Sequence, residues 1–251
     1  MCRIAWSFVA SMFVLATANA LGRPPAEPAE MLKRADAPHQ AFREGAIRLR
    51  VVVNQPGKKP LGNLLDLFVE GADRSLAVFR EGKQKGRKIL TVGDRVWLIV
   101  PGAARPVPVS KSQRLMGAAS FGDIARLRFS DEYLARLRPA EETVEQAVGE
   151  TRCRVLDLET ARKGAAYPTA VLWVGVDDGL PRRLRLSLAS GKEAKEVLFT
   201  GYGDDLRLKT MVIRDLLAPG GDNTTSLVFE SYKEQALDPA MFDPAGARAV
   251  P

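Results

Sequence analysis

The chain of 251 residues has 37 Lys and Arg against 30 Asp and Glu, which gives a formal net charge of +7. It contains one histidine, His39, and two cysteines, so the His/Cys spacings of zinc and copper sites are excluded, and a Ser-His-Asp or Cys-His site has at most one base. No glycine-rich loop opens a helix, as phosphate-binding loops do. We therefore predict a protein that is not an enzyme and that carries no metal or cofactor.

Residues 1–20 have the pattern of a secretory signal peptide. Arg3 precedes an apolar run over residues 4–18, and Ala-Asn-Ala at 18–20 has the small-x-small form that signal peptidase cleaves. The run is shorter than the ~20 residues that span a bilayer, although an uncleaved anchor stays the alternative. Lipid attachment needs a cysteine after the apolar run, whereas Cys2 precedes it. We expect cleavage after Ala20 and export from the cytoplasm.

Export decides how the charge and the second cysteine are interpreted. Outside the cytoplasm, an excess of Lys and Arg favours anionic lipid or another envelope surface as partner, rather than nucleic acid. The same charge also simply keeps a domain soluble. Once Cys2 is removed, Cys153 has no partner for an intramolecular disulfide. It lies in a strand-like run, and we expect it to be a small buried apolar residue.

Residues 21–44 are rich in Pro and Ala, and we predict a leading segment or a docked helix there, with helical character over residues 29–35. Residues 45–251 are predicted to form a single domain that begins with alternating apolar and polar residues. Short turns such as Pro-Gly and Gly-Asp separate the first strand candidates, which favours antiparallel hairpins. These candidates cover residues 47–53, 64–70, 75–81, 87–92 and 96–100.

The alternation is interrupted over residues 121–138, where Ile124, Leu127, Leu134 and Leu137 are spaced as on a helix. Strand candidates return after Pro139, at residues 152–159, 169–177, 182–190, 194–202, 207–216 and 225–234. About eleven strands around one helical interruption predict a mainly β fold of the α+β class. We expect a single curved antiparallel sheet or an incomplete barrel, with two stacked sheets as the alternative.

Three pairs of adjacent carboxylates occur beside Gly or Pro. They are Glu141 and Glu142, Asp177 and Asp178, and Asp204 and Asp205. This context is typical of solvated turn charges. A glycosidase or calcium site at one of the pairs is the alternative.

Apolar side chains recur at alternate positions of four strand candidates, as expected for one face of a sheet. They are Leu65, Leu67, Val69, Leu76, Val78, Val96, Leu98, Val100, Leu184, Leu186 and Leu188. On a concave face, such a series lines a cavity for an apolar ligand if side chains do not fill it. The alternative is an ordinary core, in which these residues pack against one another and against a helix.

Residues 92–130 carry two adjoining motifs. A D-x-x-W-x-x-x-P pattern at Asp94, Trp97 and Pro101 precedes an S-x-R-L-M-G-x-x-x-x-G-D run. The run comprises Ser112, Arg114, Leu115, Met116, Gly117, Gly122 and Asp123. With these motifs the chain resembles a divergent branch of the LolA-like family of outer-membrane lipoprotein-sorting proteins, and a looser similarity extends over residues 45–243. The resemblance implies a half-open β-barrel of the LolA/LolB type, closed by a helical lid around an apolar cavity for acyl chains.

The resemblance also predicts a function. We expect a periplasmic carrier or chaperone that binds the acyl chains of lipoproteins or lipids in its apolar cavity, for sorting to the outer membrane. Its partners would then be an inner-membrane exporter or an outer-membrane acceptor. The alternative is a non-enzymatic accessory subunit that docks on an envelope lipid exporter and has no cargo of its own.

The second motif supplies candidates for the lid. Apolar pockets are often closed by a mobile segment with apolar side chains, and the flexible Met side chain adapts to acyl chains of different shape. Three apolar residues of this motif are therefore predicted to face the cavity: Leu115, Met116 and Phe121. A fixed core plug is the alternative for these residues. Three basic residues are predicted to meet anionic headgroups or an acidic partner; they are Arg105, Lys111 and Arg114. For them the alternative is a solvated face.

Overall fold

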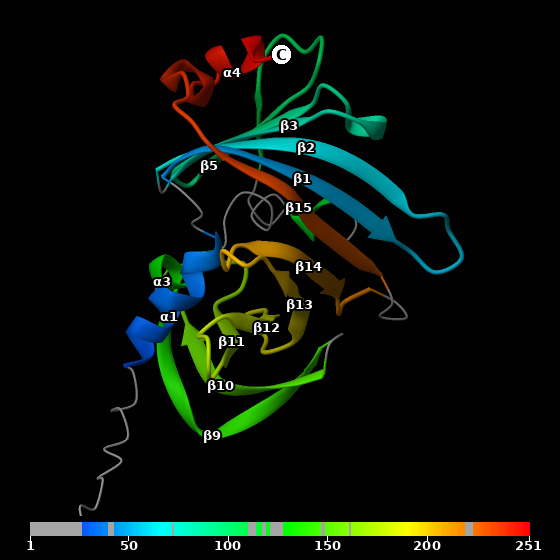
Figure 1. The fold of residues 1–251 in the computed structure, drawn as a ribbon. Helices are drawn as coiled ribbons and strands as arrows, with labels where there is room; N and C mark the ends of the chain where they lie inside the picture. Colours follow the sequence, from blue (N-terminus) through cyan, green and yellow to red (C-terminus); the bar gives the residue numbers. More distant parts are fainter. Residues whose placement is uncertain are drawn as a thin grey trace, which may run out of the picture.

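One antiparallel sheet of thirteen strands dominates the part of the chain that the computed structural model describes (Figure 1). The structure describes residues 27–39, 43–71, 73–109, 114–116, 119–120, 128–146, 149–160, 162–218 and 223–251. The strands of the first half are β1 (Glu44–Asn54), β2 (Leu61–Glu70), β3 (Arg74–Phe79), β4 (Lys88–Val92), β5 (Arg95–Ile99) and β6 (Val107–Val109). Those of the second half are β9 (Leu134–Gln146), β10 (Gly149–Glu159), β11 (Thr169–Gly175), β12 (Pro181–Ser187), β13 (Glu193–Tyr202), β14 (Leu208–Asp215) and β15 (Thr224–Glu234).

The order of the strands in the sheet is β6-β5-β4-β3-β2-β1-β15-β14-β13-β12-β11-β10-β9. Strands that are neighbours in the sheet are therefore consecutive strands of the chain, with the one exception of the β1–β15 pair. The pairing of β1 with β15, antiparallel from Gly45↔Glu234 to Asn54↔Thr224, joins the two halves in the middle of the sheet. The strands β6 and β9 form its two edges.

Short helices accompany the sheet. They are α1 (Pro28–Asp36), the 3-10 turns η1 (Ala37–His39) and η2 (Gly82–Gln84), α3 (Phe129–Glu132), the 3-10 turn η3 (Pro239–Phe242) and α4 (Gly246–Ala249). A separate two-stranded sheet consists of β7 (Arg114–Met116) and β8 (Ala119–Ser120). Among the described residues, no helix has the length and apolar character needed to cross a membrane.

The sheet is strongly curved, and it passes from β1, β2 and β3 through β15 and β14 round to β9, with α1 and α3 beside it (Figure 1). This arrangement confirms the predicted mainly β fold built on a single curved, open antiparallel sheet. The strand neighbours are continuous, so the alternative of two stacked sheets is not observed. The main sheet has thirteen strands rather than about eleven, because β6 and β9 were not recognised as strands in the sequence.

The predicted helical character of residues 121–138 was wrong for its last part, because Leu134 and Leu137 lie in β9. The spacing of these leucines resembles a helix, but β9 is an edge strand and leaves Leu134 74% exposed. The pairing of β9 with β10 shifts between Leu137↔Leu156 and Glu141↔Arg154, which leaves extra residues on β9. Pro139 lies in this irregular stretch, where an edge strand tolerates a residue without an N–H. Ile124 and Leu127 lie outside the described residues.

The two faces of the sheet are both buried, but by different elements. We call inner face the side whose apolar residues pack in one cluster with Met31, Leu32 and Ala35 of α1. We call outer face the opposite side, where η3 and α4 contribute Phe242 and Ala247 to a second cluster over β3, β4 and β5. The inner cluster draws on strands of both halves of the sheet, and it is the main core of the protein.

Candidate functional site

The inner face carries most of the apolar residues that the alternation predicted. Leu65, Leu67, Val96, Leu184 and Leu186 are buried in the inner cluster. Val69 and Leu98 are partly buried and pack against it. The curvature of the sheet brings these residues of β2, β5 and β12 into one apolar surface.

Leu76 and Val78 do not share this surface, which corrects the prediction made for β3. Leu65 pairs with Phe79, and Leu67 pairs with Ala77. Directly paired residues lie on the same face, so Phe79 and Ala77 point inward and Leu76 and Val78 point outward. Both outward residues pack with Phe242 in the outer cluster.

Two further predicted positions lie at the ends of their strands. Leu188 directly follows β12 and is half-buried, and Val100 directly follows β5. Val100 lines a cavity on the outer face rather than the inner surface.

The structure adds inner residues from strands that the sequence did not assign to this surface. They are Ile47, Leu49, Val51 and Val53 of β1, Leu156, Leu158 and Leu172 of β10 and β11, Phe199 of β13, Met211 and Ile213 of β14, and Leu227 of β15. The alternation within residues 47–53 was a visible signal for β1, but the pairing of β1 with β15 was not. The inner face is therefore a continuous apolar surface that crosses the junction of the two halves.

Helix α1 covers part of this surface. Pro28 occupies the first turn, where its missing N–H has no intrahelical partner to lose. Met31, Leu32 and Ala35 face the sheet and are 6%, 2% and 0% exposed, whereas Lys33 points to solvent. Burying these apolar side chains provides most of the stability of so short a helix.

Asp36 fixes α1 to α3. Its carboxylate is fully buried and accepts hydrogen bonds from the Phe129 amide (2.6 Å), the Ser130 amide (3.0 Å) and the Ser130 hydroxyl. Burial raises the pKa of Asp36 despite these three donors. Phe129 in turn packs edge-on against Phe199 of the inner cluster, with ring centroids 6.4 Å apart. Helix α1, helix α3 and the inner face thus form one unit.

Tyrosines surround the inner cluster and turn their rings toward it. The Tyr133 hydroxyl donates to the Tyr167 carbonyl (3.0 Å), and the Tyr202 hydroxyl donates to the Pro181 carbonyl (2.5 Å). The Tyr232 hydroxyl donates to the Leu208 carbonyl. Burial raises the pKa of all three phenols. Because each hydroxyl is satisfied by the backbone, the rings present apolar surface to the inner cluster.

The residues predicted for the lid are placed only in part. Arg114, Leu115 and Met116 form β7, which pairs with β8. Phe121 and Lys111 lie outside the described residues, and Arg105 is exposed in the connection from β5 to β6. The role of these residues as a lid, or as a contact for headgroups or a partner, stays a prediction.

The paired carboxylates have local structural partners. Asp178 bonds to the Arg182 guanidinium and accepts from the Leu180 amide (3.0 Å), and Asp205 accepts from the Arg207 amide (3.2 Å). Both lie in turns, as predicted. Glu141 and Glu142 lie in β9 instead, so the turn predicted there was wrong.

Glu142 accepts a hydrogen bond from the Trp173 indole (2.8 Å) and one from Arg138 (3.3 Å). Strand β9 thereby binds to the outer side of β11. Within the described ranges, no three His, Cys, Asp or Glu side chains are arranged to hold a metal ion.

Cys153 is fully buried beside Trp173 on the outer face of β10, as predicted from its strand-like context. Burial is the largest of the effects that raise the pKa of its thiol to about 11. A thiol of this kind is protonated and unreactive at neutral pH.

The first family motif lies on the outer face. Asp94 forms an ion pair with Arg162 (3.2 Å), and Trp97 packs against the outer cluster with Arg95 over its ring. Pro101 lies against Gly86, where a Cβ would approach the Pro101 ring to 2.9 Å. Gly86 also has φ +80°, so both its conformation and this close approach require glycine.

The fold is that of proteins with a single curved sheet whose inner face is apolar and covered by a helix. A family model described as "-like: Uncharacterized protein" matches residues 71–246, more than half of the chain. The chain belongs to this family, and the resemblance to LolA-like proteins predicted from residues 92–130 is confirmed at the level of the fold by the solved structures that follow. The comparison with curated proteins gives no match.

Solved structures share the fold at low sequence identity. A LolA superfamily protein from Nitrosomonas europaea superposes with a TM-score of 0.76 at 22% identity, over 87% of this chain and 98% of that chain. A DUF1329 family protein from Desulfovibrio piger gives 0.73 at 20% identity, over 86% and 96% of the two chains. A proposed outer membrane lipoprotein-sorting protein domain from Vibrio parahaemolyticus gives 0.72 at 17% identity, over 88% and 98%. These likenesses establish a LolA-like fold.

Proposed function

We propose that this protein is a non-enzymatic carrier or chaperone that binds acyl chains of lipoproteins or lipids on its inner face. The observation that carries the proposal is the continuity of the apolar inner surface, which extends from Leu65 on β2 across Leu49 and Leu227 to Leu184 on β12. The tyrosines at its perimeter direct their hydroxyl groups to backbone carbonyls, so they present only their rings to this surface. A continuous apolar surface without a specific polar contact suits a flexible hydrocarbon chain better than a polar substrate.

The energetics favour a cargo with more than one chain. Burying each methylene is worth ~0.8 kcal/mol, so about ten methylenes of one chain give roughly 8 kcal/mol. Association itself costs about 4–15 kcal/mol before any net affinity remains. Two or three chains, as in a diacyl lipid or an acylated lipoprotein, leave a clear surplus.

The location and partners form part of the same proposal. The signal peptide is cleaved after Ala20, the protein works in the periplasm, and cargo passes from an inner-membrane exporter to an outer-membrane acceptor. The lid consists of Leu115, Met116 and Phe121. Exposed basic residues such as Arg105, together with Lys111 and Arg114, meet the headgroup or the partner.

Two substitutions in one strand test the carrier role. Val69→Glu places a carboxylate against the inner cluster, whereas Leu61→Glu changes a side chain of β2 that is 54% exposed. A fluorescent long-chain fatty acid should bind wild-type protein and the Leu61→Glu variant alike, and Val69→Glu at least about tenfold more weakly, because a desolvated carboxylate is costly. Native mass spectrometry of protein purified from cells should show bound lipid. Protein without lipid that also fails to bind the fluorescent probe would refute the carrier role.

One observation favours the accessory subunit without cargo. Leu49, Leu65 and Phe199 are 0% exposed, so side chains already fill part of the inner face. An accessory subunit predicts recovery of an envelope exporter by affinity purification together with absence of probe binding. A carrier predicts probe binding whether or not the exporter is recovered.

A further inference from the structure

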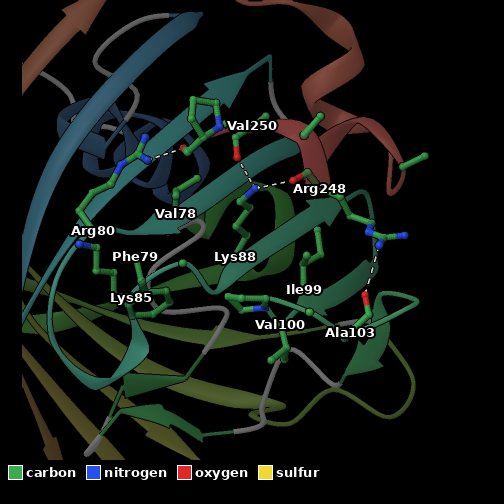
Figure 2. Close-up of a pocket in the computed structure, with 16 residues that line it drawn as sticks. Val78, Phe79, Arg80, Lys85, Lys88, Ile99, Val100, Ala103, Arg248 and Val250 are labelled. Atoms are coloured by element: carbon green, nitrogen blue, oxygen red, sulfur yellow. Dashed lines mark hydrogen bonds between the residues drawn. The ribbon is translucent and has the colours of Figure 1, made fainter.

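A cavity lies on the outer face, away from the inner apolar surface. It has a volume of about 660 Å³ and lies between the ends of β3, β4 and β5 and the C-terminal segment that includes α4 (Figure 2). Its size is within the range of about 300–1,000 Å³ that is typical of small-molecule sites. Gly86, in the turn before β4, and Pro101, in the turn after β5, form part of its wall.

Apolar side chains form much of this wall. They are Val78, Ile99, Val100, Pro101 and Val250. They come from β3, from β5 and the turn after it, and from the C-terminal segment, so the cavity depends on the packing of that segment against the sheet. This wall can accommodate the first few carbons of a hydrocarbon chain.

All charged side chains in the lining are basic: Arg80, Lys85, Lys88 and Arg248. Pro251 also lines the cavity, and its backbone oxygen accepts a hydrogen bond from Arg80. Figure 2 shows Arg80 and Lys85 on one side of the cavity, Arg248 on the other and Lys88 between them. Arg80 has a carboxylate partner, because its Nε donates to Asp66 at 2.7 Å. Among the described residues, Arg248 donates to backbone groups, at the carbonyls of Ala104 (2.8 Å) and Ala103 (3.2 Å).

Lys88 is the most informative of the four, since it is only 7% exposed. Its ammonium group donates to the carbonyls of Ala247 (3.1 Å), Arg248 (2.8 Å) and Val250. All three N–H donors therefore have acceptors, but these acceptors are neutral and do not balance the positive charge. Burial and the nearby charge of Arg80 lower the pKa of Lys88.

Among the described residues, no carboxylate lies within 4.0 Å of Lys85, Lys88 or Arg248. A buried cation without a counter-charge is costly, and an anion that enters the cavity reduces this cost.

We propose that this cavity binds the phosphate group of an amphiphile, with the adjoining hydrocarbon against Val78, Ile99 and Val100. Three cations without carboxylate partners favour a dianionic phosphate over a single carboxylate. Lys85 is exposed and has side-chain donors to offer, and Lys88 and Arg248 add charge from positions held by backbone carbonyls. The site does not depend on the inner face, because the two lie on opposite sides of β3.

Calorimetric titration with octyl phosphate, below its micelle concentration, tests the proposal. Wild-type protein should bind one molecule per chain in this cavity, and Lys85→Glu should weaken the affinity about tenfold through charge reversal. Lys83→Glu is the matched control, because Lys83 is exposed on η2 two residues away and does not line the cavity. Octanoate and inorganic phosphate should each bind more weakly than octyl phosphate, because octanoate lacks the phosphate group and inorganic phosphate lacks the hydrocarbon chain.

Three outcomes would overturn the proposal. One is equal affinity for octyl phosphate in wild-type protein and Lys85→Glu. Another is inorganic phosphate binding as tightly as octyl phosphate, which would assign the site to the free ion. The third is loss of binding in Val69→Glu but not in Lys85→Glu, which would place the ligand on the inner face. Conversely, fatty-acid binding that fails while octyl phosphate binding persists would refute the carrier role and leave this site intact.

Discussion

Replacing Asp36 by alanine removes the carboxylate that joins α1 to α3. The Phe129 amide is buried, at 2.6 Å from the Asp36 carboxylate, and would lose this acceptor. Leaving one buried donor unsatisfied costs ~1–3 kcal/mol. The Ser130 amide and hydroxyl, which are part-buried, add a smaller cost because water can reach them. Relief from burying a charge offsets part of this loss, so we expect Asp36→Ala to lower the free energy of unfolding by about 2–4 kcal/mol.

Urea unfolding followed by circular dichroism measures this loss. Ser130→Ala removes one hydroxyl donor and should cost about 1 kcal/mol, and Asp131→Ala, on the exposed side of α3, should cost less than ~0.5 kcal/mol. A loss below ~0.5 kcal/mol for Asp36→Ala would show that the carboxylate does not hold the two helices together.

The pH dependence gives a second test of Asp36. Because burial raises its pKa in the folded state, the folded protein binds more protons than the unfolded chain between the ordinary aspartate pKa and the raised value. This group therefore makes stability fall as pH rises through that window. Asp36→Asn, which keeps one acceptor oxygen, should remove that part of the slope, and an unchanged slope would contradict the assignment.

Three further outcomes follow from buried groups elsewhere. Lys88→Met keeps the apolar stem but loses three carbonyl partners, so amide hydrogen exchange over residues 246–249 should accelerate at least about tenfold, with residues 208–215 of β14 as an unaffected internal control. The thiol of Cys153, with a pKa of about 11, should be alkylated at pH 8 at least about 100-fold more slowly in native than in urea-unfolded protein; equal rates would contradict its burial. Trp173→Phe loses the indole hydrogen bond to Glu142 and should cost about 1–2 kcal/mol in urea unfolding, whereas a neutral result would show that this bond does not stabilise β9.

The sequence predicted the strands well where one face is buried and the other is solvated. In β2 and β12 the buried and half-buried positions alternate, so Leu65 and Leu184 were recognised as residues of one face. In β3 this signal fails, because residues from Ser75 to Phe79 are all buried. Alternation alone cannot say which side of such a strand is inner, and the pairing of Leu65 with Phe79 was needed to place Leu76 and Val78 outward.

Contacts between distant parts of the chain could not be predicted from the sequence. Asp36 meets Ser130 across 94 positions, and Lys88 meets the carbonyl of Ala247 across 159. Neither contact leaves a periodic pattern, because each depends on how the curved sheet positions separate segments. The family motif was visible, but Trp97 and Pro101 lie on the outer face rather than beside the predicted cavity.

Pairing, rather than the number of basic residues, decides where positive charge is available to a ligand. On β12 and β14, Arg185 and Arg214 both lie 3.1 Å from Glu196, whose side chain is 6% exposed. Both guanidinium groups are therefore engaged by a carboxylate within the sheet. At the outer cavity, Lys85 and Lys88 contact no carboxylate of the described residues, so part of the net charge of +7 is concentrated there. Added salt screens exposed ion pairs and charged binding sites alike. Reversing the single charge of Lys85 therefore distinguishes ligand binding from sheet stabilisation better than a change of salt concentration does.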